Sequence, residues 1–374
     1  MSSNPISNPQ LVQKKLVLVG PLPPPSGGMA NQTKQLRQLL SDAGINVHLV
    51  QVNAPYSPAW VGKIRLLRAF FRLIPYKIKL WKACKNADLM HIMANSGWSW
   101  HLFAAPAILI GKIRGVKVIV NYRGGEAASF FESDYRWVKP ILNKADQVIV
   151  PSGFLEAVFL KRDIQPALVS NIINLARFSP AADDESLKQL ITAPHFIVTR
   201  NLEPIYDIPT ALKAFAIVFE KYSKATMTVA GSGPELDRLI TLSKALKIDQ
   251  AVHFSGRIPN EELPKIYQKS QLMFNPTTKD NMPISMLESL ASGIPCISTN
   301  AGGIPFLVAD GVNAKLCEIG DFKTMGEMAL NLIADTDEYQ RLRNNGLQMI
   351  NDFTWPQVSQ KLFKVYLNVL NLSK

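Results

Sequence analysis

Short apolar strands alternate with amphipathic helices along nearly the whole of the 374-residue chain. The first half repeats this unit from KLVLVG (15–20) to QVIVPS (147–152), and the second half repeats it from HFIVTR (195–200) to AKLCE (314–318). Alternation of this kind favours parallel sheets joined by right-handed crossovers. We therefore predict an α/β protein.

The chain is too long for one ordinary domain, so two domains are expected. The polar, proline-bounded stretch SPAADDESLKQLITAP separates the two runs of strands. We predict two doubly wound Rossmann-like domains, 1–180 and 181–353, that face each other across a cleft. A helix near 354–374 is expected to pack back on the first domain.

Glycine-containing loops follow several of the predicted strands, at the edge where doubly wound folds bind ligands. The first of them precedes a helix, whose free N–H groups and positive dipole end suit an anion. Neither GxGxxG nor GxxxxGK spacing is present, which argues against dinucleotide and P-loop sites. Ordinary turns and short connectors remain the alternative. The candidate binding positions in these loops are Gly27, Gly28, Gly231, Gly233, Arg257 and Ile258.

The stretch KDNMPISMLESLASGIPCIST, which begins at Lys279, places two acids around a predicted helix start. Pro283 suits the first turn, so the N–H groups of the next three residues, Ile284 to Met286, should be unpaired donors. Glu288 shares a polar stripe with Ser285 and Ser292, apart from the apolar core positions. Two acids beside an anion site suit hydroxyl groups rather than phosphate. We expect Glu288 to face a ribose and Asp280 to face a sugar, the alternative being a helix-end charge and a surface ion pair.

Here the chain resembles the retaining glycosyltransferases of family 4, which have the GT-B fold. The stretch from Asp280 resembles that family's E-x7-E region, and NIINLARFSP (171–180) resembles its interdomain segment. VTRNLEP (198–204) resembles the loop that carries its phosphate-binding arginine, and FTWPQVSQKLFKVY (353–366) resembles its closing helix. The match covers nearly all of the second half and is looser in the first.

The resemblance implies transfer of a hexosyl group from a nucleoside-diphosphate sugar, with retention of configuration and without a metal or cofactor. Arg200 would stabilise the leaving diphosphate together with the amides near Gly28 and at the start of the Ile284 helix. Arg257 and Ile258 lie where the family holds the base. The donor sugar would be bounded by Asn281, Met282, Pro283 and Ile284, with Ser285 at the helix start.

Two residues after first-domain strands, His91 and Arg123, would face the acceptor side of the cleft. His91 could equally be an ordinary strand-end histidine. The triplet Asp335-Thr336-Asp337 has the form of a metal-binding pair, but it lies between helical segments and is expected to cap a helix.

Departures from the family pattern leave alternatives open. The first acid is Asp280 rather than Glu, no lysine follows Arg200 in the region of Tyr206, and Arg123 stands where the family commonly has His. Either a catalytically weakened scaffold that binds a partner, or a GT-B sugar-nucleotide epimerase, would also be compatible with parts of the pattern. NIINLARFSP and DNMPISMLES disfavour the epimerase.

Composition indicates a cytoplasmic protein. The first ten residues are polar, and the longest apolar run, HLFAAPAILI, is about half of a membrane span. Cys84, Cys296 and Cys317 show no metal or redox spacing and are expected to be buried thiols.

Positive charge is concentrated in the first half. Residues 1–180 hold 22 Lys and Arg against 8 Asp and Glu, whereas the remainder holds 19 against 21. No acid lies between Ala43 and Ala87, where Lys63–Lys85 combines basic side chains with apolar ones at helical spacing. We predict a helix, broken near Pro75, that docks on an anionic membrane surface and brings the enzyme to a lipid-linked or polysaccharide acceptor. A solvated basic face is the alternative, and nucleic acid is not expected as a partner.

Overall fold

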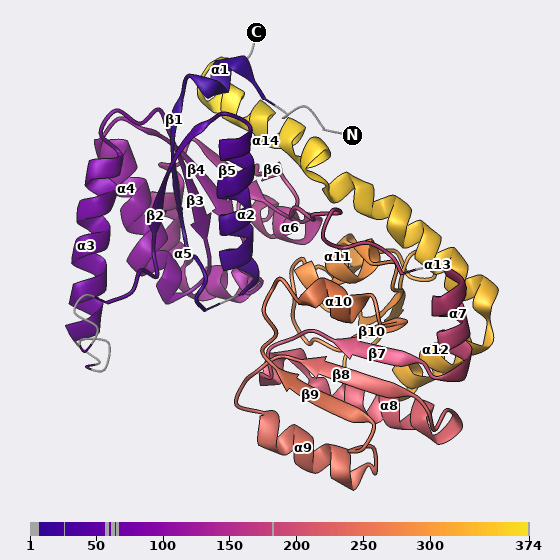
Figure 1. Cartoon of the computed structure of the whole chain (residues 1–374). Coiled ribbons are helices and arrows are strands. Elements are labelled where there is room, and N and C mark those ends of the chain that lie inside the picture. Colours follow the sequence, from indigo (N-terminus) through magenta and orange to yellow (C-terminus); the bar gives the residue numbers. More distant parts are fainter. Residues whose placement is uncertain are drawn as a thin grey trace. The chain divides into compact units, whose positions relative to one another are not determined.

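The computed structural model describes residues 7–25, 27–56, 60, 64, 67–181 and 183–372. Contacts divide the chain into two compact units (Figure 1). Unit 1 runs to Ile172 and takes in the C-terminal segment from Trp355, and unit 2 is Ile173–Thr354. The chain therefore first passes from unit 1 to unit 2 within the segment 171–180, whereas the sequence predicted a boundary after residue 180.

Unit 1 is built on a six-stranded parallel sheet with the order β2-β1-β3-β4-β5-β6. Each strand is followed by a helix or loop that returns the chain to the same end of the sheet, as the alternating sequence predicts. The strands are β1 (Lys15–Gly20), β2 (Asn46–Gln51), β3 (Leu89–Ala94), β4 (Lys117–Tyr122), β5 (Gln147–Val150) and β6 (Ala167–Leu168).

Helices cover both faces of this sheet because its strands are apolar on both sides. Val17 and Val19 of β1 point into one core, whereas Leu16 and Leu18 point into the other. The first face is covered by α3 (Leu67–Ala83), η2 (Trp100–Ala104), α4 (Ala105–Ile113), α5 (Ala127–Leu142) and α6 (Gly153–Leu160). The second is covered by α1 (Pro9–Val12), α2 (Gly28–Asp42) and α14 (Trp355–Val369).

The C-terminal helix α14 is joined to the sheet of unit 1 by a buried polar contact as well as by apolar packing. The Tyr366 hydroxyl lies 2.8 Å from Nδ1 of His91, which is fully buried in β3. Asn121 of β4 donates from Nδ2 to Nε2 of the same ring over 3.1 Å. Because Nε2 accepts, Nδ1 carries the proton and donates to Tyr366.

Unit 2 has a second six-stranded parallel sheet, ordered β12-β11-β10-β7-β8-β9. The first strand of the unit is central, and the chain turns to opposite sides of it, so the strand order reverses between β7 and β10. The strands are β7 (His195–Val198), β8 (Thr226–Ala230), β9 (Val252–Gly256), β10 (Leu272–Asn275), β11 (Cys296–Thr299) and β12 (Lys315–Cys317).

Two cores again flank the sheet, and the rings of Phe196 and Phe274 stack at 4.8 Å in one of them. That core is closed by α7 (Asp183–Thr192), α8 (Ile208–Lys221), α9 (Leu236–Ala245), α12 (Phe322–Ala334) and α13 (Thr336–Met349). The other contains α10 (Leu263–Tyr267) and α11 (Ile284–Ala291). Short 3₁₀ turns are η3 (Pro204–Tyr206), η4 (Ile304–Phe306) and η5 (Ile350–Phe353).

Some local expectations need correction, and others hold. The break near Pro75 is wrong, because α3 continues through it from Leu67 to Ala83. β6 was not foreseen, since two residues carry too little pattern to be recognised. Asp335 caps α13 by accepting from the Glu338 N–H over 2.9 Å, as expected of the triplet. Within the part of the chain that the structure describes, no helix is both long and apolar enough to cross a membrane.

Tyr366→Phe should lower the free energy of unfolding of unit 1 by about 1–3 kcal/mol, because it leaves the buried Nδ1–H of His91 without an acceptor. Urea denaturation followed by circular dichroism checks this. Tyr135→Phe is a matched control, since its half-buried hydroxyl donates to the Arg162 carbonyl over 3.0 Å near the surface. Equal losses in the two variants would contradict a special role for the His91 contact.

Candidate active site

An arginine and an aspartate meet where the strand order of the second sheet reverses. Arg200 follows β7 and Asp280 follows β10, so both lie beyond the carboxyl ends of the two strands at the switch point. Arg200 Nη2 donates to Asp280 Oδ2 over 2.6 Å, and the two side chains are only 10% and 15% exposed. The sequence suggested both residues for the site but not their direct contact.

Two further residues hold the Arg200 guanidinium. The Asn275 carbonyl Oδ1 accepts from Arg200 Nε and Nη2 over 2.8 and 2.7 Å, and the Asn275 amide donates to Ser298 Oγ over 2.9 Å. The Tyr206 ring lies 5.2 Å from the guanidinium carbon, within reach of a cation–π contact. Sequence reasoning missed both, although Asn275 is a fully buried polar residue closing the apolar strand LMFN.

Glycines bring the loops of this site together by backbone packing. A Cβ at Gly231 would lie 1.8 Å from the Arg200 carbonyl oxygen, and one at Gly233 would lie 2.2 Å from that of Leu202. A Cβ at Gly303 would similarly lie 1.9 Å from the Asn281 oxygen. Gly231 and Gly233 were expected to admit a ligand, but they are needed for the approach of a neighbouring loop.

The start of α11 offers fewer free amides than expected. Pro283 is the N-cap residue, not part of the first turn, and the Met286 N–H already donates to its carbonyl over 3.2 Å. The N–H groups of Ile284 and Ser285 have no acceptor among the described residues. Ser285 Oγ is also buried without a hydrogen-bond partner there. The start of α11 thus has three hydrogen-bond donors that no described residue engages: the Ser285 hydroxyl and the N–H groups of Ile284 and Ser285.

Glu288 is held inside unit 2, one turn into α11. The Tyr267 hydroxyl donates to its Oε2 over 3.2 Å. Burial raises the pKa of Glu288 to about 7, while the positive charges of Arg177 and Arg200 oppose that rise. Ser285 and Ser292, which share the polar stripe of Glu288, are buried as well, at 8% and 2% exposed.

The remaining predicted donor positions lie on loops of the same unit. Asn281 donates its N–H to Asp280 Oδ1 over 2.8 Å, and both Asn281 and Met282 are buried. Arg257 is exposed and Ile258 half-buried after β9. Their predicted contacts with the donor stay predictions.

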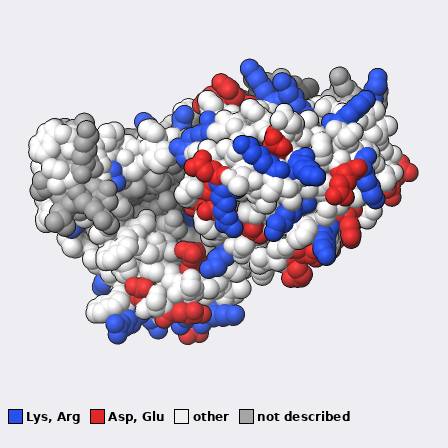
Figure 2. Space-filling view, turned by 90° about the horizontal axis from the view of Figure 1, so that it is seen from below, with Lys and Arg blue, Asp and Glu red and all other residues white. Residues whose placement is uncertain are grey.

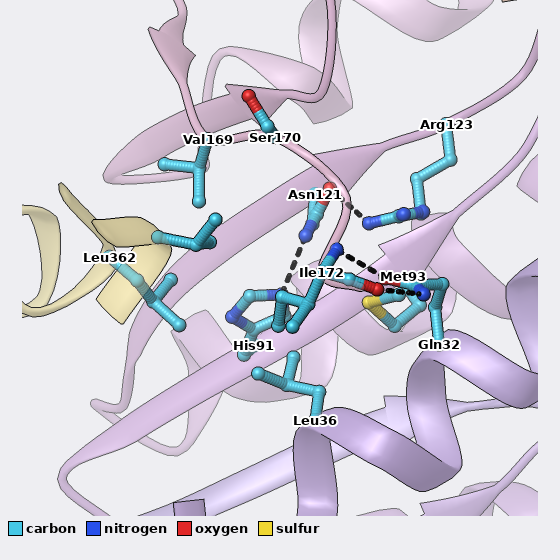
Figure 3. A pocket seen from close by; sticks show the side chains of 11 residues that line it. Gln32, Leu36, His91, Met93, Asn121, Arg123, Val169, Ser170, Ile172 and Leu362 are labelled. Carbon is cyan, nitrogen blue, oxygen red and sulfur yellow. Dashed lines mark hydrogen bonds between the residues drawn. The ribbon is translucent and has the colours of Figure 1, made fainter. Parts of the chain in front are cut away.

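In unit 1 the predicted positions fall at two places. Gly27 is the N-cap residue of α2 and Gly28 its first residue. Arg123 follows β4 and, with His91 and Asn121, lines a small pocket (Figure 3). His91 is fully buried with both ring nitrogens bonded, and burial lowers its pKa to about 3. This favours an interior histidine over an acceptor contact.

Between about pH 4.5 and 7, native Glu288 binds its proton more tightly than it would in the unfolded chain, so the free energy of unfolding should fall as pH rises. At 1.36 kcal/mol per pKa unit, the fall amounts to about 1–3 kcal/mol. Glu288→Gln should remove this component. Urea denaturation of both proteins at pH 5 and pH 7.5 measures it, and identical pH dependence would contradict the raised pKa.

Two known protein families match different halves of this chain. The family described as "Glycosyl transferases group 1" matches residues 183–349, and "Glycosyltransferase Family 4" matches residues 26–177. The N-acetyl-alpha-D-glucosaminyl L-malate synthase of Bacillus anthracis is 24% identical over 63% of this chain and 59% of its own length. An alpha-monoglucosyldiacylglycerol synthase of Streptococcus pneumoniae is 28% identical over 54% of this chain and 47% of its own. The matches thus span about half the length of these relatives.

Solved structures share the fold of the whole chain. Sucrose-phosphate synthase from Thermosynechococcus elongatus matches with a TM-score of 0.77 at 20% identity, over 96% of this chain and all of its own. HepE of Anabaena, solved in complex with UDP-glucose, matches with a TM-score of 0.71 at 15% identity, over 95% of this chain and all of its own. At these identities the likeness shows the GT-B fold.

Proposed function

Because the chain belongs to the group 1 glycosyltransferases, the GT-B proteins of family 4, we propose that it transfers a hexosyl group from a nucleoside-diphosphate sugar to a lipid-linked or polysaccharide acceptor. Transfer would proceed with retention of configuration and without a metal ion. The proposal rests foremost on one observation: Arg200 and Asp280 meet at the switch point of the second sheet.

The leaving diphosphate would be stabilised by groups already fixed in place. Arg200 is held by Asn275, so its charge needs no rearrangement as negative charge grows on the leaving oxygen. The Ile284 and Ser285 amides and the Ser285 hydroxyl have no protein acceptors among the described residues and suit phosphate oxygens.

The two acids suit the hydroxyl groups of the donor. Asp280 uses one oxygen for Arg200 and the other for the Asn281 N–H, and each retains a lone pair for a sugar hydroxyl. Glu288, partly buried beside Tyr267, would accept from the ribose. HepE binds UDP-glucose and has the same fold, which makes UDP-sugars the first donors to test.

Arg200→Ala should reduce turnover more than donor binding, because diphosphate charge is larger in the transition state than in the ground state. Removing a charge-assisted contact should cost about 100-fold in turnover. Hydrolysis of UDP-sugars by the purified protein, followed by chromatography with and without EDTA, checks both this and the absence of a metal requirement.

Arg238→Ala is a matched control, since this arginine of α9 is 70% exposed and pairs only with Glu235. It should leave turnover unchanged. A strict need for Mg²⁺ or Mn²⁺, or full activity in Arg200→Ala, would sink the assignment of the diphosphate to Arg200.

We further propose that α3 docks on an anionic membrane. Phe70, Ile74, Ile78 and Trp81 recur every three or four residues and are 45–64% exposed, although the opposite face of the helix, with Tyr76, is buried. Helix α4 packs beside α3, with Arg114 4.9 Å from the Trp81 ring, and its last residue Ile113 is 71% exposed. The apolar stripe therefore continues onto a second helix.

Exposed lysines accompany this stripe. Lys77, Lys79, Lys82 and Lys85 are exposed, and α3 contains no acidic residue. Lys63 and Arg65, which the sequence places in the same basic segment, lie outside the described residues. Where charged side chains are dense on the face seen in Figure 2, by contrast, both signs are interspersed. Basic and apolar side chains on one helix suit an anionic lipid surface.

Exchanging Lys77, Lys79 and Lys82 for Glu should weaken co-sedimentation with vesicles of anionic lipid by at least about 100-fold, at about 1 kcal/mol per lysine. The triple exchange of Lys221, Lys224 and Lys244, which are exposed on unit 2, is the matched control and should sediment like the wild type. Binding to neutral vesicles, or equal sedimentation of both triple variants, would indicate a solvated basic face instead.

A further inference from the structure

Arg123 carries a mostly buried positive charge that no acid opposes. Its guanidinium donates to Oδ1 of Asn121 over 3.5 Å (Figure 3). It also donates to Oδ1 of Asn171, and both partners are neutral amides. Among the ion pairs of the described residues, none joins a carboxylate to Arg123. The first turn of α5 contains no acid.

This cation keeps its charge at neutral pH. Burial lowers the pKa of Arg123, but only to about 10. A guanidinium has five N–H donors in a planar fork, and the two amide oxygens engage two of them. The remaining donors suit the paired oxygens of a phosphate.

The pocket beside Arg123 supplies no competing negative charge. Its polar lining consists of Gln32, His91, Asn121 and Ser170, and His91 is neutral because its pKa is about 3. The cavity volume is about 20 Å³, room for one water-sized group. A single ligand oxygen fits there, and the bulk of the ligand would stay outside.

The two residues that follow Arg123 in the chain offer backbone donors. The N–H groups of Gly124 and Gly125 have no acceptor among the described residues. A Cβ at Gly124 would lie 2.2 Å from Ser96 Oγ and 2.7 Å from Asn95 Oδ1, so the absence of a side chain lets the loops after β3 and β4 pack together. Successive free amides next in sequence to a cation are the kind of donors that bind anions in proteins.

We propose that Arg123, with the amides of Gly124 and Gly125, binds a phosphate group carried by the acceptor. The identification of the phosphate with the acceptor rests on the proposed function, whereas the phosphate site itself does not. The acceptor would thus be a phosphate ester, with its sugar-accepting hydroxyl outside the small pocket.

Inorganic phosphate is the direct probe, but it would also meet Arg200. Calorimetric titration is therefore done in an Arg200→Gln background, where phosphate binding should persist. Adding Arg123→Gln should weaken that binding by at least about ten-fold, since charge-assisted hydrogen bonds are lost. Adding Arg37→Gln instead, which removes an exposed arginine of α2, should leave it unchanged.

Equal phosphate affinity with and without Arg123→Gln would overturn the proposal. If circular dichroism shows that this variant is misfolded, Arg123→Lys is measured in its place. Lysine keeps the positive charge but lacks the planar guanidinium that can bind two phosphate oxygens. Several-fold weaker phosphate binding would support the site, and unchanged binding would overturn it. A phosphate site without any turnover of nucleotide sugars would remove the proposed function and leave the site standing.

Water-soluble glycerol 3-phosphate and a short-chain phosphatidic acid below its micelle concentration distinguish the sources of the phosphate. If glycerol 3-phosphate binds more tightly and its binding depends on Arg123, the acceptor is a soluble phosphate ester. If phosphatidic acid does so instead, the acceptor carries a lipid phosphate. If neither binds through Arg123, the assignment to an acceptor phosphate is wrong.

Discussion

The contact between Arg200 and Asp280 organises the candidate site of unit 2. A partly buried ion pair gains little stability by itself, because each charge loses hydration on burial. Here the cost is limited by hydrogen bonds that fix both partners: Asn275 bonds the guanidinium, and the Asn281 N–H bonds the carboxylate. The pair is better understood as a device that fixes a cation at the switch point than as a source of folding energy.

Backbone packing supplies the precision that side chains alone would lack. Gly231 and Gly233 let one loop lie against the carbonyls of Arg200 and Leu202, while Gly302 and Gly303 do the same for Asp280 and Asn281. The Gly303 N–H also donates to the Asp280 carbonyl over 2.9 Å. Each member of the ion pair is therefore carried on a loop whose path a neighbouring glycine pair determines. A larger residue at these glycines would shift the loop and with it the charge.

The sequence predicted the strands and the residues that follow them because period and loop position are local properties. It suggested Asp280 and Glu288 for the site in this way, whereas Arg200 came from the resemblance of its loop to that of family 4. It missed Asn275 and Tyr267, whose importance depends on contacts between segments 75 and 21 residues apart, and it missed the contact of the Tyr206 ring with Arg200 within one loop. Pro75 illustrates the same limit of local prediction. A proline inside a helix predicts a break, but Tyr76 and Leu80 pack in the core and α3 continues past Pro75.

Arg200 and Arg123, each only partly exposed, differ in what an incoming anion must displace. At Arg200 an anion competes with Asp280, so part of its attraction is offset by the loss of an existing pair. At Arg123 the neighbours are amide oxygens without net charge, and no ion pair among the described residues has to be displaced. Asn121 also links Arg123 to His91, and His91 to Tyr366 of the C-terminal helix. The position of the Arg123 guanidinium is therefore coupled, through hydrogen bonds between neutral groups, to helix α14, which covers the second core of unit 1. Binding of an anion at Arg123 would act on this network.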